Sequence, residues 1–149
     1  IIRNKLFGGN LNCERIMALA VYHEVSEVIT GDMATPIKYF NPEIKNAYKN
    51  IEAIASQKLL QMLPDELKEG YEPLLTHKDN ENEEWNIVKA ADKISAYLKC
   101  LEELKAGNQE FSKAEKSLKS EIEKMKLPEV EYFMKVFVPS FLLTLDELN

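Results

Sequence analysis

IVKAADKISAYLKCLEELK, residues 87–105, is the stretch that decides the fold class. Its apolar residues recur three and four positions apart, the spacing that keeps one face of an α-helix apolar. They are Ile87, Ala90, Ala91, Ile94, Leu98 and Leu101. The pair Gly107-Asn108 that follows is a typical signal for the end of a helix. The stretch therefore predicts a long amphipathic helix.

The same spacing continues on both sides of this stretch. A second long helix is expected over residues 44–62, ended by Pro64, with one stripe formed by Ile44, Tyr48, Ile51, Ala55, Leu59 and Met62. Further helices are expected over about 12–29, 65–69, 111–125 and 129–138, with an irregular connection at 32–42 and a polar turn at 79–82. With no repeat or linker in view, the sequence predicts one all-α domain over residues 1–149.

Composition excludes several classes of function. Acidic residues outnumber basic ones by 25 to 19 and the net charge is −6, so a binder of polymeric DNA or RNA is not expected. Apolar runs fall far short of the roughly 20 residues that cross a bilayer, so we expect no membrane segment. Cys13 and Cys100 lack a metal-type spacing and follow no signal peptide, which favours reduced thiols and a cytoplasmic protein. The chain opens at Ile1 without Met, and we expect a preceding segment to be missing.

Polar residues interrupt the expected first helix at one place. His23 and Glu27 are four residues apart and Glu24 and Glu27 are three apart, so on a helix their side chains would share one patch. Such a patch has two interpretations. It can be a solvated helix face, which is common, or part of a functional site.

A carboxylate also interrupts the long helix expected over residues 87–105. Asp92 lies between Ala90-Ala91 and Ile94, among residues expected to be buried, and a buried carboxylate must be paired, hydrogen-bonded or bound to a metal. One histidine and several carboxylates from different helices suit Mn²⁺, Mg²⁺, Co²⁺, Fe²⁺ or Zn²⁺. We therefore expect His23, Glu24, Glu27 and Asp92 to converge on one cavity.

The loop that follows the first polar cluster is a third candidate element. Residues 30–36 lie about one helical turn beyond Glu27 and could overhang the site. The alternative interpretation is a helix stop followed by a turn that proline stiffens.

Taken together, these residues resemble a known family. The string YHEVSEVITGDMATPIKYFN, residues 22–41, resembles the YHDxSEVLTGDxPTPVKYFN signature of bacterial 5′-deoxynucleotidases in the HD-domain phosphohydrolase superfamily. ADK at 91–93 with AYLKCLEEL at 96–104 is similar to the helix that carries the last metal-binding aspartate of that family. YFM at 132–134 and FVPSF at 137–141 also match.

The resemblance implies a fold and an activity. The fold is an all-helical HD-domain bundle that holds one divalent cation through an upstream histidine, a His-Asp doublet and a distant aspartate. The activity is removal of the 5′-phosphate from deoxynucleoside 5′-monophosphates. Mn, Co, Mg and Zn are all candidates for the cation, and we expect a homodimer.

The resemblance also assigns roles to residues. His23, Glu24 and Asp92 fall on metal positions, and Glu27 falls on the catalytic acidic residue that lies beside the attacking water and orients or deprotonates it. Substrate contacts are expected from Glu24, Glu27, Asp92 and the loop residues Asp32, Met33, Ala34 and Thr35. The upstream histidine, with an arginine and a tryptophan that engage phosphate and sugar, would precede Ile1.

Two positions depart from the family pattern. Glu24 stands where the family has the aspartate of the doublet, and its extra methylene could displace the ligand oxygen by about 1 Å. Ala34 replaces a loop proline, which should loosen the loop. Three functions therefore stay open: an active 5′-deoxynucleotidase, a catalytically impaired relative that binds metal or nucleotide, and a helical interaction module without a site.

Overall fold

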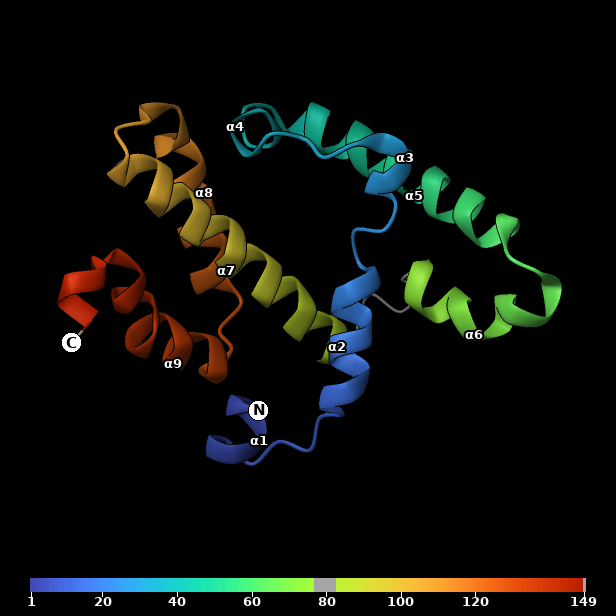
Figure 1. Cartoon of the computed structure of the whole chain (residues 1–149), viewed down its shortest axis with the longest axis horizontal. Coiled ribbons are helices and arrows are strands. Elements are labelled where there is room, and N and C mark those ends of the chain that lie inside the picture. Colours follow the sequence, from blue (N-terminus) through green and yellow to red (C-terminus); the bar gives the residue numbers. More distant parts are fainter. Residues whose placement is uncertain (77–82, 149) are drawn as a thin grey trace. The chain divides into compact units, whose positions relative to one another are not determined.

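A computed structural model describes residues 1–76 and 83–148 (Figure 1). These residues form α-helices and short 3-10 helices and no strand, which confirms the all-α prediction for the described part of the chain. The expected turn at 79–82 lies outside it. The elements are α1 (Ile2–Leu6), α2 (Cys13–Tyr22), α3 (Glu27–Thr30), α4 (Thr35–Lys38), α5 (Pro42–Met62), α6 (Asp65–Leu75), α7 (Glu83–Lys105), η1 (Gln109–Phe111), α8 (Ser112–Lys124), α9 (Pro128–Val136), η2 (Val138–Leu142) and η3 (Leu145–Leu148).

The chain divides into two compact units, each of which is described by itself. One unit comprises Ile1–Leu11 and Lys89–Asn149, and the other comprises Asn12–Val88. A single domain over residues 1–149 therefore stays a prediction.

The unit formed by residues 12–88 is organised around α5. Asn41 caps this helix, because its side chain accepts a hydrogen bond from the backbone N–H of Glu43, and Pro42 has a backbone angle suited to the first helical turn. Figure 1 shows α6 running back along α5, and α3 and α4 also pack on α5. α2 packs on α6, where the rings of Tyr22 and Tyr71 meet edge to face with centroids 5.9 Å apart.

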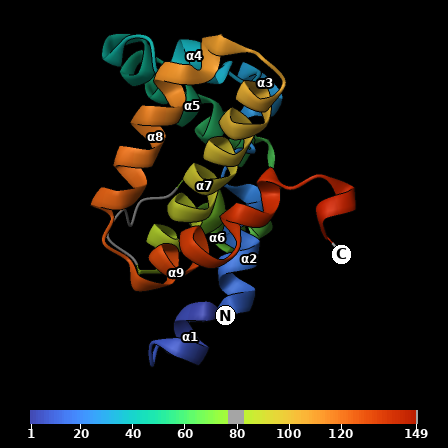
Figure 2. The same cartoon turned by 90° about the vertical axis from the view of Figure 1, so that its left-hand side faces the viewer.

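The other unit is built from the greater part of α7 together with α1, α8 and α9. Figure 2 shows α7 and α8 side by side, and an ion pair between Lys93 and Glu121 joins them. Its buried residues include Tyr97, Cys100, Ala114, Leu118 and Ile122. Their three- and four-residue spacing along α7 and α8 explains why these helices could be predicted from the sequence.

The first predicted helix differs from the expectation. It was expected to reach about Ile29, but α2 ends at Tyr22 and α3 begins at Glu27. Between them the N–H groups of Val25 and Glu27 donate to carbonyls three residues back, at 3.1 and 2.9 Å, so the backbone forms tight turns. β-branched Val25 and the small polar Ser26 are weak helix formers, which fits a break at this point.

Two further expectations need correction. The short helix expected at 65–69 extends to Leu75 as α6, although Gly70 and Pro73 weaken its pattern. Packing of α6 on α2 and α5 explains how the helix tolerates them. The connection at 32–42, expected to be irregular, contains the one-turn helix α4.

No helix among the described residues is both long enough and apolar enough to cross a membrane.

Candidate active site

His23 is the first residue after α2. Its Nδ1 atom lies 2.7 Å from the backbone carbonyl oxygen of Ala20, so the Nδ1–H group donates to this carbonyl. A neutral imidazole that donates through Nδ1 carries its free lone pair on Nε2. The preceding turn of α2 thus fixes the tautomer and the ring orientation that a metal-binding histidine requires.

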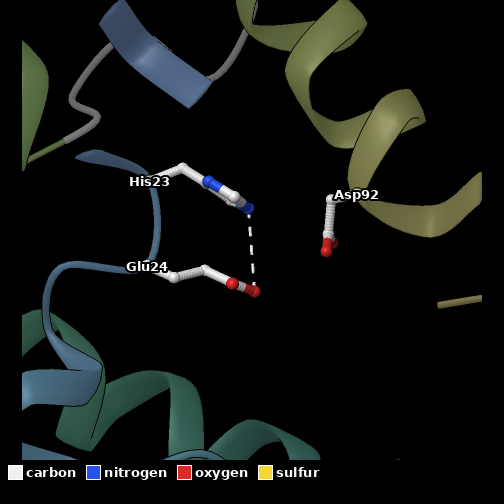
Figure 3. A group of neighbouring side chains, drawn as sticks. All are labelled: His23, Glu24 and Asp92. Atoms are coloured by element: carbon white, nitrogen blue, oxygen red, sulfur yellow. Dashed lines mark ion pairs between the residues drawn. The ribbon is translucent and has the colours of Figure 1, made fainter. Parts of the chain in front are cut away.

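Glu24 lies next to this nitrogen. Its Oε1 atom is 3.6 Å from Nε2 of His23, a contact that Figure 3 marks with a dashed line and that is an ion pair only when the imidazole is protonated. Two ligand bonds of about 2.1 Å to one cation span at most about 4.2 Å, so this separation is compatible with both atoms binding the same ion. The nitrogen and carboxylate donors therefore fit a divalent cation.

Glu27 opens α3 and has an unusual proton affinity. Burial is the largest cause that raises the pKa of its carboxyl; together with the negative charges of Glu24, Asp32 and Glu52, and against the opposing effect of Lys38, it brings the pKa from 4.5 to about 7. A carboxyl that titrates near neutral pH can exchange a proton with water under physiological conditions, which is the property of a general base.

Two charged residues around Glu27 were not expected from the sequence. Glu52 of α5 also has a raised pKa, mainly because it is partly buried, and Lys38 of α4 counteracts the shift in both glutamates. A sequence signal for Glu52 was available. It stands three residues before buried Ala55 and four before buried Ser56, so it shares the inner face of α5.

The loop after α3 carries the predicted substrate contacts. Gly31 ends α3 with φ 73° and ψ 168°, a backbone conformation that is essentially restricted to glycine. Asp32 and Ala34 are exposed, whereas Met33 and Thr35 are half-buried. Asp32 is close enough to Glu27 for its charge to raise the pKa of Glu27. The structure thus places this loop beside Glu27 within the same unit.

Asp92 belongs to the other unit and lies on α7, where Figure 3 draws it. Its neighbours Ala90 and Ile94 are buried, as expected, at 2% and 8% exposure, whereas Ala91, also expected to be buried, is exposed. Asp92 itself is half-buried. Its convergence with His23, Glu24 and Glu27 stays a prediction.

Comparison with known proteins identifies close relatives along the whole chain. A family model described as YfbR-like 5′-deoxynucleotidase matches residues 1–141. A 5′-deoxynucleotidase of Vibrio parahaemolyticus is 56% identical over 149 residues, which is 100% of this chain and 77% of the relative. Similar proteins of Vibrio vulnificus and Photorhabdus laumondii, also named 5′-deoxynucleotidases, are 54% and 55% identical over all of this chain and over 77% and 76% of their own lengths.

Proposed function

The chain belongs to the YfbR-like 5′-deoxynucleotidase family, and from this premise we propose that it hydrolyses deoxynucleoside 5′-monophosphates with the residues described above. The observation that carries the proposal is the match over the whole chain to relatives that bear this enzyme name. The near-neutral carboxyl of Glu27, beside the expected substrate loop, supports it independently.

We assign His23, Glu24 and Asp92 to the divalent cation. Nε2 of His23 and the Glu24 carboxylate are adjacent, and the bond from Nδ1 to Ala20 holds the imidazole in a ligating tautomer. When bound, the cation would polarise the phosphoryl oxygens and lower the pKa of water. Nitrogen and carboxylate ligands suit Mn²⁺, Co²⁺, Mg²⁺ and Zn²⁺.

Glu27 is the proposed catalytic residue. Its carboxylate accepts a proton from the attacking water as the water oxygen bonds to phosphorus. The bond from phosphorus to the 5′-oxygen breaks, and the departing alkoxide takes up a proton from solvent or from a group of the site, so the products are a deoxynucleoside and inorganic phosphate. A pKa of about 7 leaves a large fraction of Glu27 ionised at neutral pH, ready to accept that proton.

Asp32, Met33, Ala34 and Thr35 are the proposed substrate contacts, together with Glu24, Glu27 and Asp92. The exposed Asp32 and the Thr35 hydroxyl supply hydrogen-bonding groups, and their loop follows α3 directly. This arrangement would bring the sugar end of a small nucleotide close to the carboxylate that activates water.

A homodimer is the proposed assembly. Several apolar side chains of the 12–88 unit are exposed, among them Phe40 at 68% and Met62 at 77%, and such surfaces favour association. Light scattering coupled to size-exclusion chromatography measures the mass directly, and a monomer at micromolar concentration would contradict the proposal.

We also propose that the protein works in the cytoplasm, where the thiols of Cys13 and Cys100 would stay reduced. Cell fractionation tests this, and recovery from an oxidising compartment would contradict it.

The decisive experiment measures phosphate release from a panel of nucleotides by the natural protein. The panel contains deoxynucleoside 5′-monophosphates, their ribose counterparts and 3′-monophosphates, each with Mn²⁺, Co²⁺, Mg²⁺ or Zn²⁺ and with EDTA. We expect release from 5′-deoxynucleotides that depends on the cation. No release with any cation would reject the proposed function, and metal-independent release would reject the role of the cation.

A further inference from the structure

The segment that follows α3 is held by hydroxyl groups from two directions. The hydroxyl of Tyr48 on α5 donates to the backbone carbonyl of Gly31, and the Thr30 hydroxyl donates to the same carbonyl at 2.8 Å. The two hydroxyl oxygens are 3.3 Å apart. One backbone carbonyl therefore anchors this segment to the longest helix of its unit.

The neighbouring elements give the segment little stability of their own. α3 and α4 each have four residues, far fewer than the dozen or more that an isolated helix needs in water. Gly31, Asp32 and Ala34 between them are exposed. The position of the loop must therefore depend on contacts with another element, and α5 supplies them because both short helices pack on it.

Tyr48 does not resemble a functional residue in the sequence. It stands on the apolar stripe of α5 with Ala55, at the spacing of a core residue, and its ring is half-buried. Its hydroxyl nevertheless reaches the C-terminal end of α3, at the backbone turn where the proposed substrate loop begins.

We propose that Tyr48 is a positioning residue for the substrate loop, residues 31–35. The inference rests on the proposed function, since that function makes the loop a substrate contact. Tyr48 touches neither the substrate nor the cation in this proposal. It acts through the Gly31 carbonyl and holds the backbone before Asp32 in one conformation, so that the loop does not have to be ordered when the nucleotide binds.

The test compares Tyr48→Phe with Tyr132→Phe in the natural protein. Tyr48→Phe removes only the hydroxyl that anchors Gly31. Tyr132→Phe is the matched control, because the Tyr132 ring packs edge to face on Phe7 and Phe137 in the other unit. A third variant, Thr30→Val, removes the second donor and keeps the β-branched shape.

The expected kinetic result is a higher KM with little change in kcat. Loss of one net hydrogen bond predicts a rise of about 3- to 10-fold in KM for deoxynucleoside 5′-monophosphates with Tyr48→Phe. Affinity for Mn²⁺ should not change. Thr30→Val should raise KM in the same way. The KM of the double variant should be only slightly higher than that of either single variant, because both hydroxyls act on one carbonyl.

Hydrogen exchange gives a readout that does not depend on catalysis. In metal-free protein, amides of residues 31–35 should exchange faster in Tyr48→Phe than in wild type, whereas amides in the middle of α5 should not. Tyr132→Phe should match wild type in both experiments.

Failure of the inference is distinguishable from failure of the proposed function. Suppose that wild type hydrolyses deoxynucleotides but Tyr48→Phe has the wild-type KM, with or without a fall in kcat. The positioning role of Tyr48 is then wrong, and the proposed function stands. If wild type releases no phosphate from any deoxynucleotide, the function is wrong and the inference falls with it.

Discussion

The carboxylate of Glu24 lies 3.6 Å from Nε2 of His23, on the side of the imidazole opposite the Nδ1 atom that bonds to Ala20. Glu24 is the residue at which this chain departs from the His-Asp doublet that the resemblance of residues 22–41 implies. Its position beside the nitrogen that we propose as a ligand supports the proposal that the longer side chain still reaches a shared cation. This geometry favours a glutamate that works as a ligand over one that has disabled the site.

Substitution of Glu24 tests this interpretation. We expect Glu24→Asp to change the rate of phosphate release only modestly and Glu24→Ala to abolish it, because a carboxylate of either length binds oxygen-seeking cations and a methyl group binds none. Steady-state kinetics at saturating metal measure both, and circular dichroism confirms that the variants keep their helices.

A different outcome would change the classification of the protein. If Glu24→Asp raised the rate by about 10²-fold or more, the natural glutamate would have misplaced the ligand by about 1 Å, and the protein would be a catalytically impaired relative.

Gly31 gives a prediction about the backbone. Alanine at this position should lower the free energy of unfolding by about 1–3 kcal/mol, because φ 73° with ψ 168° is strained for any residue with a Cβ atom. Crowding does not contribute, since a Cβ atom built on Gly31 meets no atom within 4 Å. Urea unfolding of the metal-free protein measures the change.

Gly70 is the matched control for Gly31. It lies inside α6, and a Cβ atom built there also has open space. Gly70→Ala should stabilise the protein by about 0.5–1 kcal/mol, since glycine is the poorer helix former. Equal effects of the two substitutions would contradict the explanation by backbone strain.

The two cysteines should differ in reactivity. Cys100 is completely buried, and burial together with the charges of Glu115 and Glu103 raises the pKa of its thiol. Because the thiolate is the reactive form, Cys100 should react with a disulfide reagent at pH 8 far more slowly than the partly exposed Cys13.

Thiol titration measures this difference. We expect one thiol to react quickly in the native protein and two in denaturant, and Cys13→Ser should remove the fast phase. A fast phase that survives Cys13→Ser would show that α7 opens readily around Cys100.

Helices whose apolar residues recur every three or four positions could be predicted from the sequence. α5, α8 and α9 begin and end within about two residues of their expected ends, and α7 ends at the expected Lys105 but begins four residues early, at Glu83, because burial of one face determines these helices. The break between α2 and α3 could not be predicted in this way. It depends on individual backbone hydrogen bonds in residues 23–27, where His23 and Glu24 gain their positions.

The inner face of α5 shows a second limit of pattern reading. Ile51 and Met62 belong to the expected stripe but are 51% and 77% exposed, whereas Glu52 is half-buried. Hydrophobicity alone cannot show that α3 and α4 pack on α5 or that the charges of Lys38, Glu24 and Asp32 act on Glu52. The charged surroundings of Glu27 therefore became visible only with the tertiary structure.

The charged surroundings of Glu27 lead to a prediction about how the stability of the protein depends on pH. The folded pKa of Glu27, about 7, exceeds its unfolded value of 4.5, so between these values the folded state binds more protons than the unfolded state. Stability contributed by this group is complete below about pH 4.5 and is lost as the pH rises through 7. Without screening, a pKa shift of this size would change the free energy of unfolding by about 3 kcal/mol. Because Glu27 is partly exposed, we expect a change of about 1 kcal/mol.

Glu27→Gln isolates this contribution, since glutamine has a similar shape and no charge. In EDTA, the variant should become more stable than wild type by about 1 kcal/mol at pH 8, and this advantage should disappear as the pH falls towards 4.5. Urea unfolding across this range measures the difference, and Glu123→Gln, at an exposed position on α8, corrects for loss of a surface charge. A difference that stays constant with pH, or that grows towards acid, would show that Glu27 has an ordinary carboxyl, and its proposed role as the base would lose its physical support.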